Sequence, residues 1–487
     1  MRADSSRMAG VLMPLASLPG GDGVGTMGAE ARRFVDFLAD TGWRIWQVLP
    51  LNPLGYGNSP YQPFSSYAGD PLYIDLDVLA KQGYLPKERP QLPVTDRIDY
   101  EAAKKHRLPL LRQAFAAFEA SGAEGEAFET FCREEEWVYP YAVFVTLKEQ
   151  NGGKCWNLWP KAQQNWILDH RYDIRPLEED IRFQMFLQYQ FAMQWTELKA
   201  YANSKGIYMV GDIPFYVGLD SLDVWQRRDN FLLDKRGNPD FVAGVPPDYF
   251  SPTGQRWGNP IYNWETMEKD NFRFWVERIA YSKRLYDIIR IDHFRAFDTF
   301  WKIPASCPTA VEGEWIEPPG YEVLTTLYRE MPDLWLIAED LGDLRPEVLE
   351  LRDAFDLPGM NVAEFTLNRR GCVKQNQVSY TGTHDNQTVL GWLQSMKPVD
   401  YQRAVHRLSL AGRRRDSLVE RMVELVLNCE SDYAIIPVMD LLELDDSARL
   451  NTPGTVGSPN WEWRLTDMGA LEARSRRFRR MLYQANR

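Results

Sequence analysis

The stretch Asp287-Ile-Ile-Arg-Ile-Asp292-His293-Phe294-Arg295 decides how this chain folds. A short apolar run bounded by charged residues is typical of a strand that is buried on both faces. Because side chains alternate along a strand, Arg290 and Asp292 share one face. A neighbouring guanidinium holds a buried carboxylate charged and lowers its pKa. The pattern therefore predicts either a structural Arg–Asp pair closing a strand end or an ionised aspartate that can act as a nucleophile.

The same strand pattern recurs along the chain. Two further apolar runs, 207–212 and 334–339, also end in an acid, and amphipathic helical stripes separate most of the runs. Eight parallel strands with helical crossovers form a closed barrel, so we expect an α/β fold of the (β/α)8 TIM barrel class. The candidate strands lie near residues 11–15, 45–49, 207–212, 287–292, 334–339, 360–363, 378–384 and 433–438.

Two segments interrupt the alternation of strand and helix. We expect one catalytic barrel domain over residues 1–487, with a mainly helical insertion at 84–180 after the second strand. Leu108, Leu111, Phe115 and Phe118 mark an amphipathic helix within that insertion. A second insertion, at 213–270 after the third strand, is expected to carry an active-site loop.

Composition narrows the functional class. The net charge of −12 argues against a nucleic-acid-binding surface, and no apolar run is long enough to span a membrane. Five scattered cysteines without a CxxC pair indicate a reducing compartment, so we expect a cytoplasmic protein or one in a plastid after removal of a transit peptide. The spacing of Gly23, Gly25 and Gly28 matches a dinucleotide-binding loop. However, the glycines do not follow the strand directly and no acid ends the next strand, so we expect no cofactor.

Four acids stand at the ends of four predicted strands: Asp212, Asp292, Glu339 and Asp385. In a parallel barrel these ends converge on one mouth, where barrel enzymes perform their chemistry. Paired carboxylates suit glycosidic bond cleavage, in which one is ionised and the other carries a proton. Asp292 beside Arg290 is the natural ionised member, and Glu339, without a flanking cation, is the better proton carrier.

Two other functional classes stay open at this point. His293, His384, Asp292 and Asp385 could bind a metal in a barrel hydrolase, although the chain has only five histidines and no HxH or HExxH motif. A glucan-binding protein without catalysis is the second alternative, and the complete set of acids argues against it.

Several stretches resemble glycoside hydrolase family 77, the 4-α-glucanotransferases called amylomaltase or disproportionating enzyme. They follow the family's order from about residue 10 to 465, and no catalytic position departs from the family pattern. The matching stretches are Trp46-Gln-Val-Leu-Pro-Leu51, Gly55-Tyr-Gly-Asn-Ser-Pro-Tyr-Gln62, Gly211-Asp-Ile-Pro-Phe-Tyr-Val217, Gly244-Val-Pro-Pro-Asp-Tyr-Phe250, Gln255-Arg-Trp-Gly-Asn-Pro260, Arg290-Ile-Asp-His-Phe-Arg295, Ala338-Glu-Asp-Leu-Gly342, Gly382-Thr-His-Asp-Asn386 and Asn451-Thr-Pro-Gly-Thr455.

The resemblance implies a retaining double displacement on α-1,4-glucans, without a metal, with maltooligosaccharides as donors and acceptors. It implies Asp292 as nucleophile, Glu339 as acid/base and Asp385 as transition-state stabiliser. In a retaining enzyme the first two carboxyl groups lie about 5–5.5 Å apart. The substrate-binding residues that it implies are Tyr61, Asp212, Arg290 and His384 around the reacting sugar, Tyr249, Phe250 and Trp257 on the acceptor side, and Tyr56 in an outer glucan site.

Transfer requires a sugar hydroxyl to reach the intermediate before water does. An apolar lid over residues 245–250, hinged at Gly244 and Gly254, could exclude water and hold the acceptor. The residues alone would equally allow an α-amylase-type hydrolase, and the family resemblance favours transfer.

Overall fold

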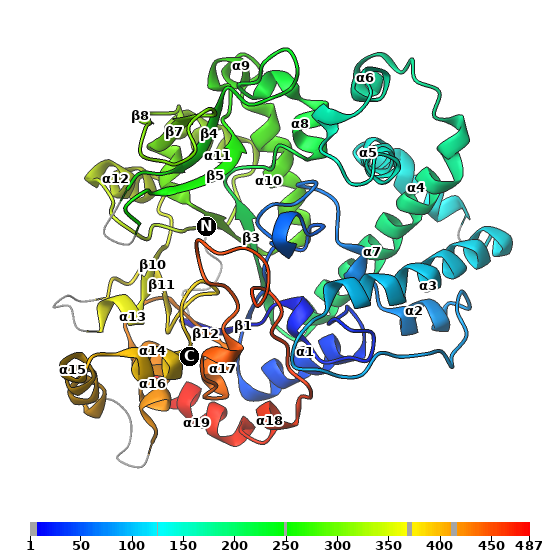
Figure 1. The fold of residues 1–487 in the computed structure, drawn as a ribbon. Helices are drawn as coiled ribbons and strands as arrows, with labels where there is room; N and C mark the ends of the chain where they lie inside the picture. The colour runs from blue at the N-terminus through cyan, green and yellow to red at the C-terminus, as the bar shows by residue number, and fades with distance from the viewer. Residues whose placement is uncertain (1–6, 124, 248–250, 368–372, 411–415) are drawn as a thin grey trace.

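The computed structural model describes residues 7–123, 125–247, 251–367, 373–410 and 416–487. Eight parallel strands form its centre, confirming the predicted barrel class (Figure 1). All eight predicted strands are present with shifted ends: the first begins at Met8 rather than Val11, and the seventh ends at Tyr380 rather than His384. They are β1 (Met8–Leu12), β2 (Ile45–Gln47), β3 (Tyr208–Pro214), β6 (Ile288–Asp292), β9 (Leu336–Ala338), β10 (Gly359–Val362), β11 (Gln377–Tyr380) and β12 (Tyr433–Pro437).

The strands follow the spatial order β10-β11-β12-β1-β2-β3-β6-β9. The barrel nearly closes between the two ends of that order. The Ala338 amide donates to the Pro358 carbonyl at 2.9 Å, and the Met360 amide donates to Asp340 Oδ1 at 2.7 Å. Closure brings the carboxyl ends of all eight strands around one rim.

Helices cover the barrel from outside. The α-helices are α1 (Ala29–Thr41), α2 (Leu76–Lys81), α3 (Tyr100–Ser121), α4 (Gly125–Glu134), α5 (Val138–Gln150), α6 (Lys161–Asp169), α7 (Glu178–Ser204), α8 (Leu222–Gln226), α9 (Trp264–Lys269), α10 (Arg273–Leu285), α11 (Gly320–Glu330), α12 (Pro346–Ala354), α13 (Ala363–Thr366), α14 (Val389–Ser395), α15 (Pro398–Ser409), α16 (Leu418–Asn428), α17 (Val438–Leu441), α18 (Gly469–Glu472) and α19 (Ser475–Ala485). Gly42 ends α1 in the left-handed conformation (φ 96°), as its position in the sequence predicts. Within the described ranges, no helix combines the length and apolarity that crossing a bilayer requires.

The segment between β2 and β3 carries the helices α2 to α7, of which α3 to α6 lie to one side of the barrel (Figure 1). Leu111, Phe115 and Phe118 of α3 are buried, but Leu108 is 51% exposed, so its assignment to the apolar stripe is wrong. Arg107, one turn before Leu111, takes the inward position and donates to the Ile74 carbonyl. The division into one barrel with insertions at 84–180 and 213–270 stays a prediction.

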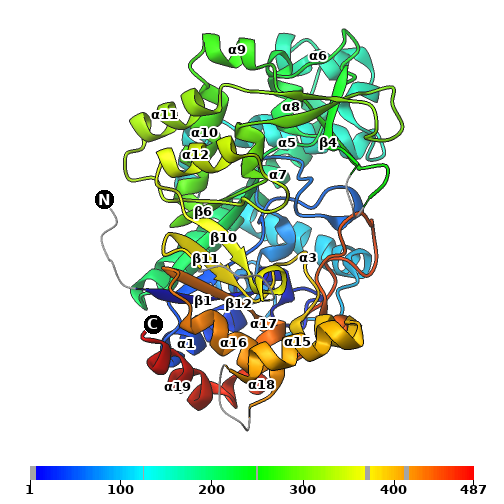
Figure 2. The ribbon, with the colours of Figure 1, turned by 90° about the vertical axis from the view of Figure 1, so that its left-hand side faces the viewer.

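A second, antiparallel sheet lies at one end of the molecule, at the top of Figure 2 near α8 and α9. Its order is β5-β4-β7-β8, with β4 (Phe241–Val245), β5 (Gln255–Pro260), β7 (Phe300–Pro304) and β8 (Glu314–Ile316). The predicted hinge at Gly244 is wrong, because this residue pairs with both Arg256 and Trp301 inside the sheet. Gly254 lies outside the strands with φ 65°, so it alone of the two has the freedom of a turn glycine.

Candidate active site

The register of three neighbouring strands brings the predicted acids together. Asp212 of β3 pairs with Arg290 of β6, two residues before Asp292. Ile291 pairs with Ala338 of β9, so Asp292 and Glu339 leave adjacent strands at the same level. Side chains at paired positions of parallel strands point to the same face. Two carboxyl groups therefore emerge side by side from the strand ends.

Arg290 connects two of these acids. Its Nη1 donates to both oxygens of Asp212, at 2.7 and 2.6 Å, and to Asp292 Oδ1 at 3.2 Å. The side chains of Arg290 and Asp212 are 4% and 0% exposed, whereas that of Asp292 is 30% exposed. The guanidinium thus neutralises a fully buried aspartate and leaves Asp292 partly open at the rim.

Glu339 is held by the backbone rather than by a cation. Its Oε2 accepts from the His293 amide at 2.8 Å and its Oε1 from the Leu341 amide at 3.0 Å. His293 has a left-handed backbone (φ 56°), which turns the chain immediately after Asp292. Both oxygens of Glu339 are therefore fixed in direction, and the two N–H groups can stabilise a negative charge there.

The pKa shift of Asp292, one of the predicted catalytic carboxyl groups, differs from the expectation drawn from the sequence. Burial raises the pKa of Asp292 well above its ordinary value, against the charge of Arg290 and reinforced by Asp212, Glu339 and Asp385. Burial likewise raises the pKa of Glu339, against Arg290 and the two amide hydrogen bonds. The expectation that Arg290 leaves Asp292 with a lowered pKa is wrong, because burial and the neighbouring acids outweigh Arg290, which Asp292 also shares with Asp212.

Asp385 reaches the site from the loop after β11. Asn451 Nδ2 donates to its Oδ1 at 2.6 Å, and His384 Nε2 lies 3.5 Å from its Oδ2. Arg449 Nη2 donates to the Asp385 carbonyl at 2.9 Å. Burial lowers the pKa of His384 despite the neighbouring Asp385, so the imidazole is neutral near pH 7. The Asp385 side chain is 45% exposed and thus open to a ligand.

Tyr61 connects Asp212 on β3 with His384 in the loop after β11. Its hydroxyl donates to Asp212 Oδ2 at 2.8 Å and lies 3.3 Å from His384 Nδ1. Its ring stacks on His384 with centroids 4.9 Å apart and planes 21° apart. The structure therefore brings Tyr61, Asp212, Arg290 and His384 into one connected group with Asp292 and Asp385.

The other predicted substrate-binding residues are more dispersed. Trp257 on β5 lies edge-on to His293, with ring centroids 4.9 Å apart, so it reaches the surroundings of Asp292. Tyr56 lies on a short 3-10 helix (Tyr56–Asn58) and is 81% exposed. Tyr249 and Phe250 lie outside the described residues. Among the described side chains, no group of three His, Cys, Asp or Glu has the arrangement of a metal's ligands.

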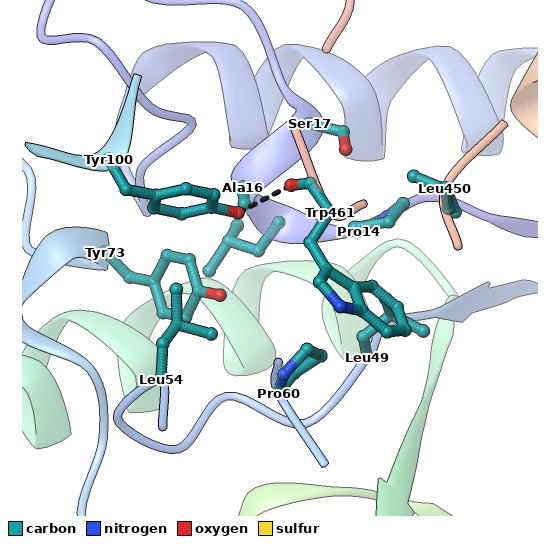
Figure 3. Close-up of a pocket in the computed structure, with 11 residues that line it drawn as sticks. Pro14, Ala16, Ser17, Leu49, Leu54, Pro60, Tyr73, Tyr100, Leu450 and Trp461 are labelled. Atoms are coloured by element: carbon teal, nitrogen blue, oxygen red, sulfur yellow. Dashed lines mark hydrogen bonds between the residues drawn. The ribbon is translucent and has the colours of Figure 1, made fainter. Parts of the chain in front are cut away.

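Trp461 was not assigned to the site from the sequence. Its ring lies 5.7 Å from that of Tyr61 and 6.0 Å from that of His384. Its backbone is left-handed (φ 66°), which is unusual for so large a residue. Figure 3 shows the Tyr100 hydroxyl donating to the Trp461 carbonyl, at 2.6 Å, beside a small pocket. Trp461 therefore packs against both rings of the Tyr61–His384 stack.

Asn451 is the second residue whose place the sequence did not reveal. It opens the matching stretch 451–455, but only the structure shows its contact with Asp385. Both Asn451 and Trp461 follow β12 in irregular segments, where neither periodicity nor a strand end marks them. The motif itself was the one signal available for Asn451.

The chain matches known proteins over almost its full length. A family model described as 4-alpha-glucanotransferase, glycoside hydrolase family 77, matches residues 13–470. The 4-alpha-glucanotransferase of Thermus thermophilus is 43% identical over 478 residues, which cover 94% of this chain and 95% of the relative. That of Streptococcus pneumoniae (TIGR4) is 41% identical over 480 residues, covering 95% and 94%.

Solved structures agree with the sequence relatives. The amylomaltase of Streptococcus agalactiae in complex with acarbose superposes with a TM-score of 0.94 at 35% identity, covering 99% of both chains. The amylomaltase of Corynebacterium glutamicum, at 18% identity, has a TM-score of 0.76 over 99% of this chain and 75% of that one, which shows the shared fold alone. With its site geometry, its length and its relatives in agreement, the chain belongs to the 4-alpha-glucanotransferase family, glycoside hydrolase family 77.

Proposed function

We propose that this chain transfers α-1,4-glucan segments between maltooligosaccharides by a retaining double displacement, with Asp292 as nucleophile and Glu339 as acid/base. One observation carries the proposal: Asp292 and Glu339 leave adjacent, paired strands at the same level. Such a pair suits attack on one side of a sugar linkage and protonation of the leaving oxygen. The expected carboxyl separation of about 5–5.5 Å stays a prediction.

In the first step, a carboxylate oxygen of Asp292 forms a bond to C1 of the donor sugar. The bond from C1 to the glycosidic oxygen breaks, and Glu339 gives its proton to that oxygen. In the second step, the 4-hydroxyl of an acceptor loses its proton to Glu339 and attacks C1. The ester bond to Asp292 then breaks, which restores both carboxyl groups and the configuration at C1.

The mechanism needs Glu339 to be protonated and Asp292 to be ionised at the start. Arg290 touches Asp292 directly and favours its ionised form. After the first step Glu339 carries the negative charge, and the His293 and Leu341 amides are positioned to stabilise it. The same two hydrogen bonds hold its oxygens in place for the return of the proton.

Asp385 has the role of transition-state stabiliser in this proposal. Its Oδ1 is fixed by Asn451, and its side chain is open toward a ligand. A carboxylate beside the reacting ring can bind sugar hydroxyls and favour a distorted ring that carries positive charge. Tyr61, Asp212, Arg290 and His384 form the connected group that would bind this sugar.

Transfer rather than hydrolysis requires that the acceptor side excludes water. Trp257 beside His293 is an apolar surface that suits this task. The roles of Tyr249 and Phe250 in acceptor binding stay predictions from the family resemblance. Tyr56, as an exposed aromatic, suits stacking on a glucan chain away from the reacting bond.

Incubation with maltotriose tests the proposal. Transfer yields glucose together with a ladder of longer maltodextrins, whereas an α-amylase-type hydrolase yields glucose and maltose alone. An unchanged substrate would indicate a glucan-binding protein without catalysis. Activity is expected to survive EDTA, and its loss on metal stripping would favour the metal-dependent alternative.

A further inference from the structure

One acid close to the site has no role in the chemistry described above. Glu364 lies on α13, directly after β10, and its Oε2 accepts from Asn386 Nδ2 at 2.6 Å. Asn386 in turn follows Asp385 in the loop after β11. A carboxylate thus holds the side chain next to a proposed catalytic residue.

A chain of hydrogen bonds connects Glu364 to the Asp385 backbone, and each link donates toward Glu364. Asn386 Oδ1 accepts from both the amide and the hydroxyl of Thr383, each at 2.9 Å. Because the Thr383 hydroxyl donates to Asn386, it is free to accept, and it does so from the Asp385 amide at 3.2 Å. The relay Glu364–Asn386–Thr383–Asp385 therefore has one donor and one acceptor at each step.

We propose that Glu364 is a positioning residue whose ionised carboxylate fixes the 383–386 turn and thereby aims Asp385 at the sugar. The role of Asp385 rests on the proposed function. A charged acceptor makes a stronger hydrogen bond than a neutral one, so the turn is held most firmly when Glu364 is ionised.

The surroundings of Glu364 make that charge sensitive to pH near neutrality. Burial raises the pKa of Glu364 to about 7, against its hydrogen bond with Asn386 and the charge of Arg449, and with the repulsion of Asp440 and Asp446. Arg449 also donates to the Asp385 carbonyl, so it acts on both ends of the relay.

The two neighbouring acids hold the flanks of the same loop. Asp440 accepts from the Thr381 hydroxyl at 2.6 Å and the Val389 amide at 2.8 Å, and Asp446 accepts from the Thr388 amide at 3.0 Å. Burial raises the pKa of Asp440 to about 6, so Asp440 also titrates in this range. A substitution at Glu364 itself is therefore needed to separate its contribution to the pH dependence of activity from that of Asp440.

The test compares pH profiles of wild type and Glu364→Gln. Gln keeps the shape and an oxygen acceptor for Asn386 but has no charge to lose. At pH 8 we expect kcat/KM of Glu364→Gln to be about two- to fivefold below wild type. Because wild type loses its charged acceptor as the pH falls and the variant does not, the ratio of variant to wild type should return toward one by pH 6. The change should lie in kcat, with KM nearly constant.

Glu149→Gln is the matched control. Glu149 on α5 is also a carboxyl with a raised pKa that accepts from a side-chain amide, Gln184 Nε2 at 3.2 Å. The ratio of kcat/KM of Glu149→Gln to that of wild type should stay constant with pH. Glu364→Leu, which removes the acceptor altogether, should lower kcat at least tenfold at pH 8. A pH-independent ratio for Glu364→Gln, or wild-type kcat in Glu364→Leu, would overturn the assignment.

Asp385→Asn separates the two proposals. If Asp385→Asn is inactive while the Glu364→Gln ratio does not change with pH, only the role of Glu364 is wrong. If Asp385→Asn retains near-normal transfer, the proposed function of Asp385 is wrong, and the relay has no catalytic residue to position.

Discussion

Arg290 Nη1 donates to both carboxylate oxygens of Asp212, at 2.7 and 2.6 Å, deep inside the barrel. The same nitrogen reaches Asp292 at 3.2 Å. Removing one partner of a buried ion pair leaves the other as an uncompensated buried charge, which destabilises the fold. The position of Asp292 at the rim therefore depends on a pair of residues that has almost no contact with solvent.

We expect Arg290→Lys to lower kcat by about 10²–10³-fold, because an ammonium group on a shorter, differently shaped side chain cannot serve both acids in the same way. Steady-state transfer from maltotriose measures this loss. Arg112→Lys is the control, since Arg112 pairs with Asp180 at 2.6 Å on the helical segment, and it should leave kcat unchanged. A nearly normal kcat in Arg290→Lys would contradict the account of the pair.

Most of the barrel strands could be predicted because they are apolar runs bounded by polar residues, as in 287–292, whereas β10 (Gly-Met-Asn-Val) gives only a weak signal. The antiparallel sheet could not, because its strands contain glycine, proline and polar residues without alternation, as in Gln255-Arg-Trp-Gly-Asn-Pro260. Leu108 was misplaced for a related reason: Arg107 takes the inward position and satisfies its charge partly through a backbone carbonyl, which hydrophobic periodicity does not reveal.

In the site, the convergence of the acids could be predicted from their positions at strand ends, because the carboxyl ends of parallel barrel strands meet at one rim. The ionisation of those acids was not predictable from neighbours in the sequence. Arg290 precedes Asp292 by two residues, yet its strongest contacts are with Asp212, 78 residues away along the chain. Asn451 and Trp461 come from irregular segments whose path is determined only by the folded chain.

We expect Asn451→Ala to lower kcat by about 10–100-fold, because it removes the 2.6 Å hydrogen bond that holds Asp385 Oδ1. Hydrogen bonds to a charged group contribute about 1.5–3 kcal/mol, which corresponds to a change of this size when the loss is felt in the transition state. The measurement is kcat on maltotriose. Asn376→Ala, which removes a similar bond to Asp356 at 2.9 Å, is the control, and equal losses in both variants would contradict a specific role for Asn451.

Tyr100→Phe should lower the free energy of unfolding by about 1–2 kcal/mol, because the Trp461 carbonyl loses a buried 2.6 Å hydrogen bond. Urea denaturation followed by fluorescence measures the change. Tyr139→Phe on α5, where the side chain is 43% exposed, should change the stability much less. If the two variants lose the same stability, the Tyr100 hydroxyl does not hold Trp461 in place.

His293 predicts a pH dependence of stability. Burial lowers the pKa of His293 to about 3, below its ordinary value of about 6.5. The unfolded chain therefore binds a proton between these values that the folded protein does not, so stability is full above about pH 6.5 and falls as the pH decreases toward 3. His293→Gln should show a shallower fall between pH 7 and pH 4.5 in urea denaturation. Equal slopes for wild type and variant would show that His293 titrates normally.

The central claim is that Asp292 forms a covalent bond with the donor sugar, while Glu339 first protonates the leaving oxygen and then deprotonates the acceptor. Glu339→Gln incubated with α-maltotriosyl fluoride tests it most directly, because fluoride leaves without protonation and the variant lacks the base needed for the second step. Mass spectrometry of the intact protein and its peptides is predicted to show one maltotriosyl unit attached to Asp292. An adduct on another residue, or an active Asp292→Asn variant, would contradict the account.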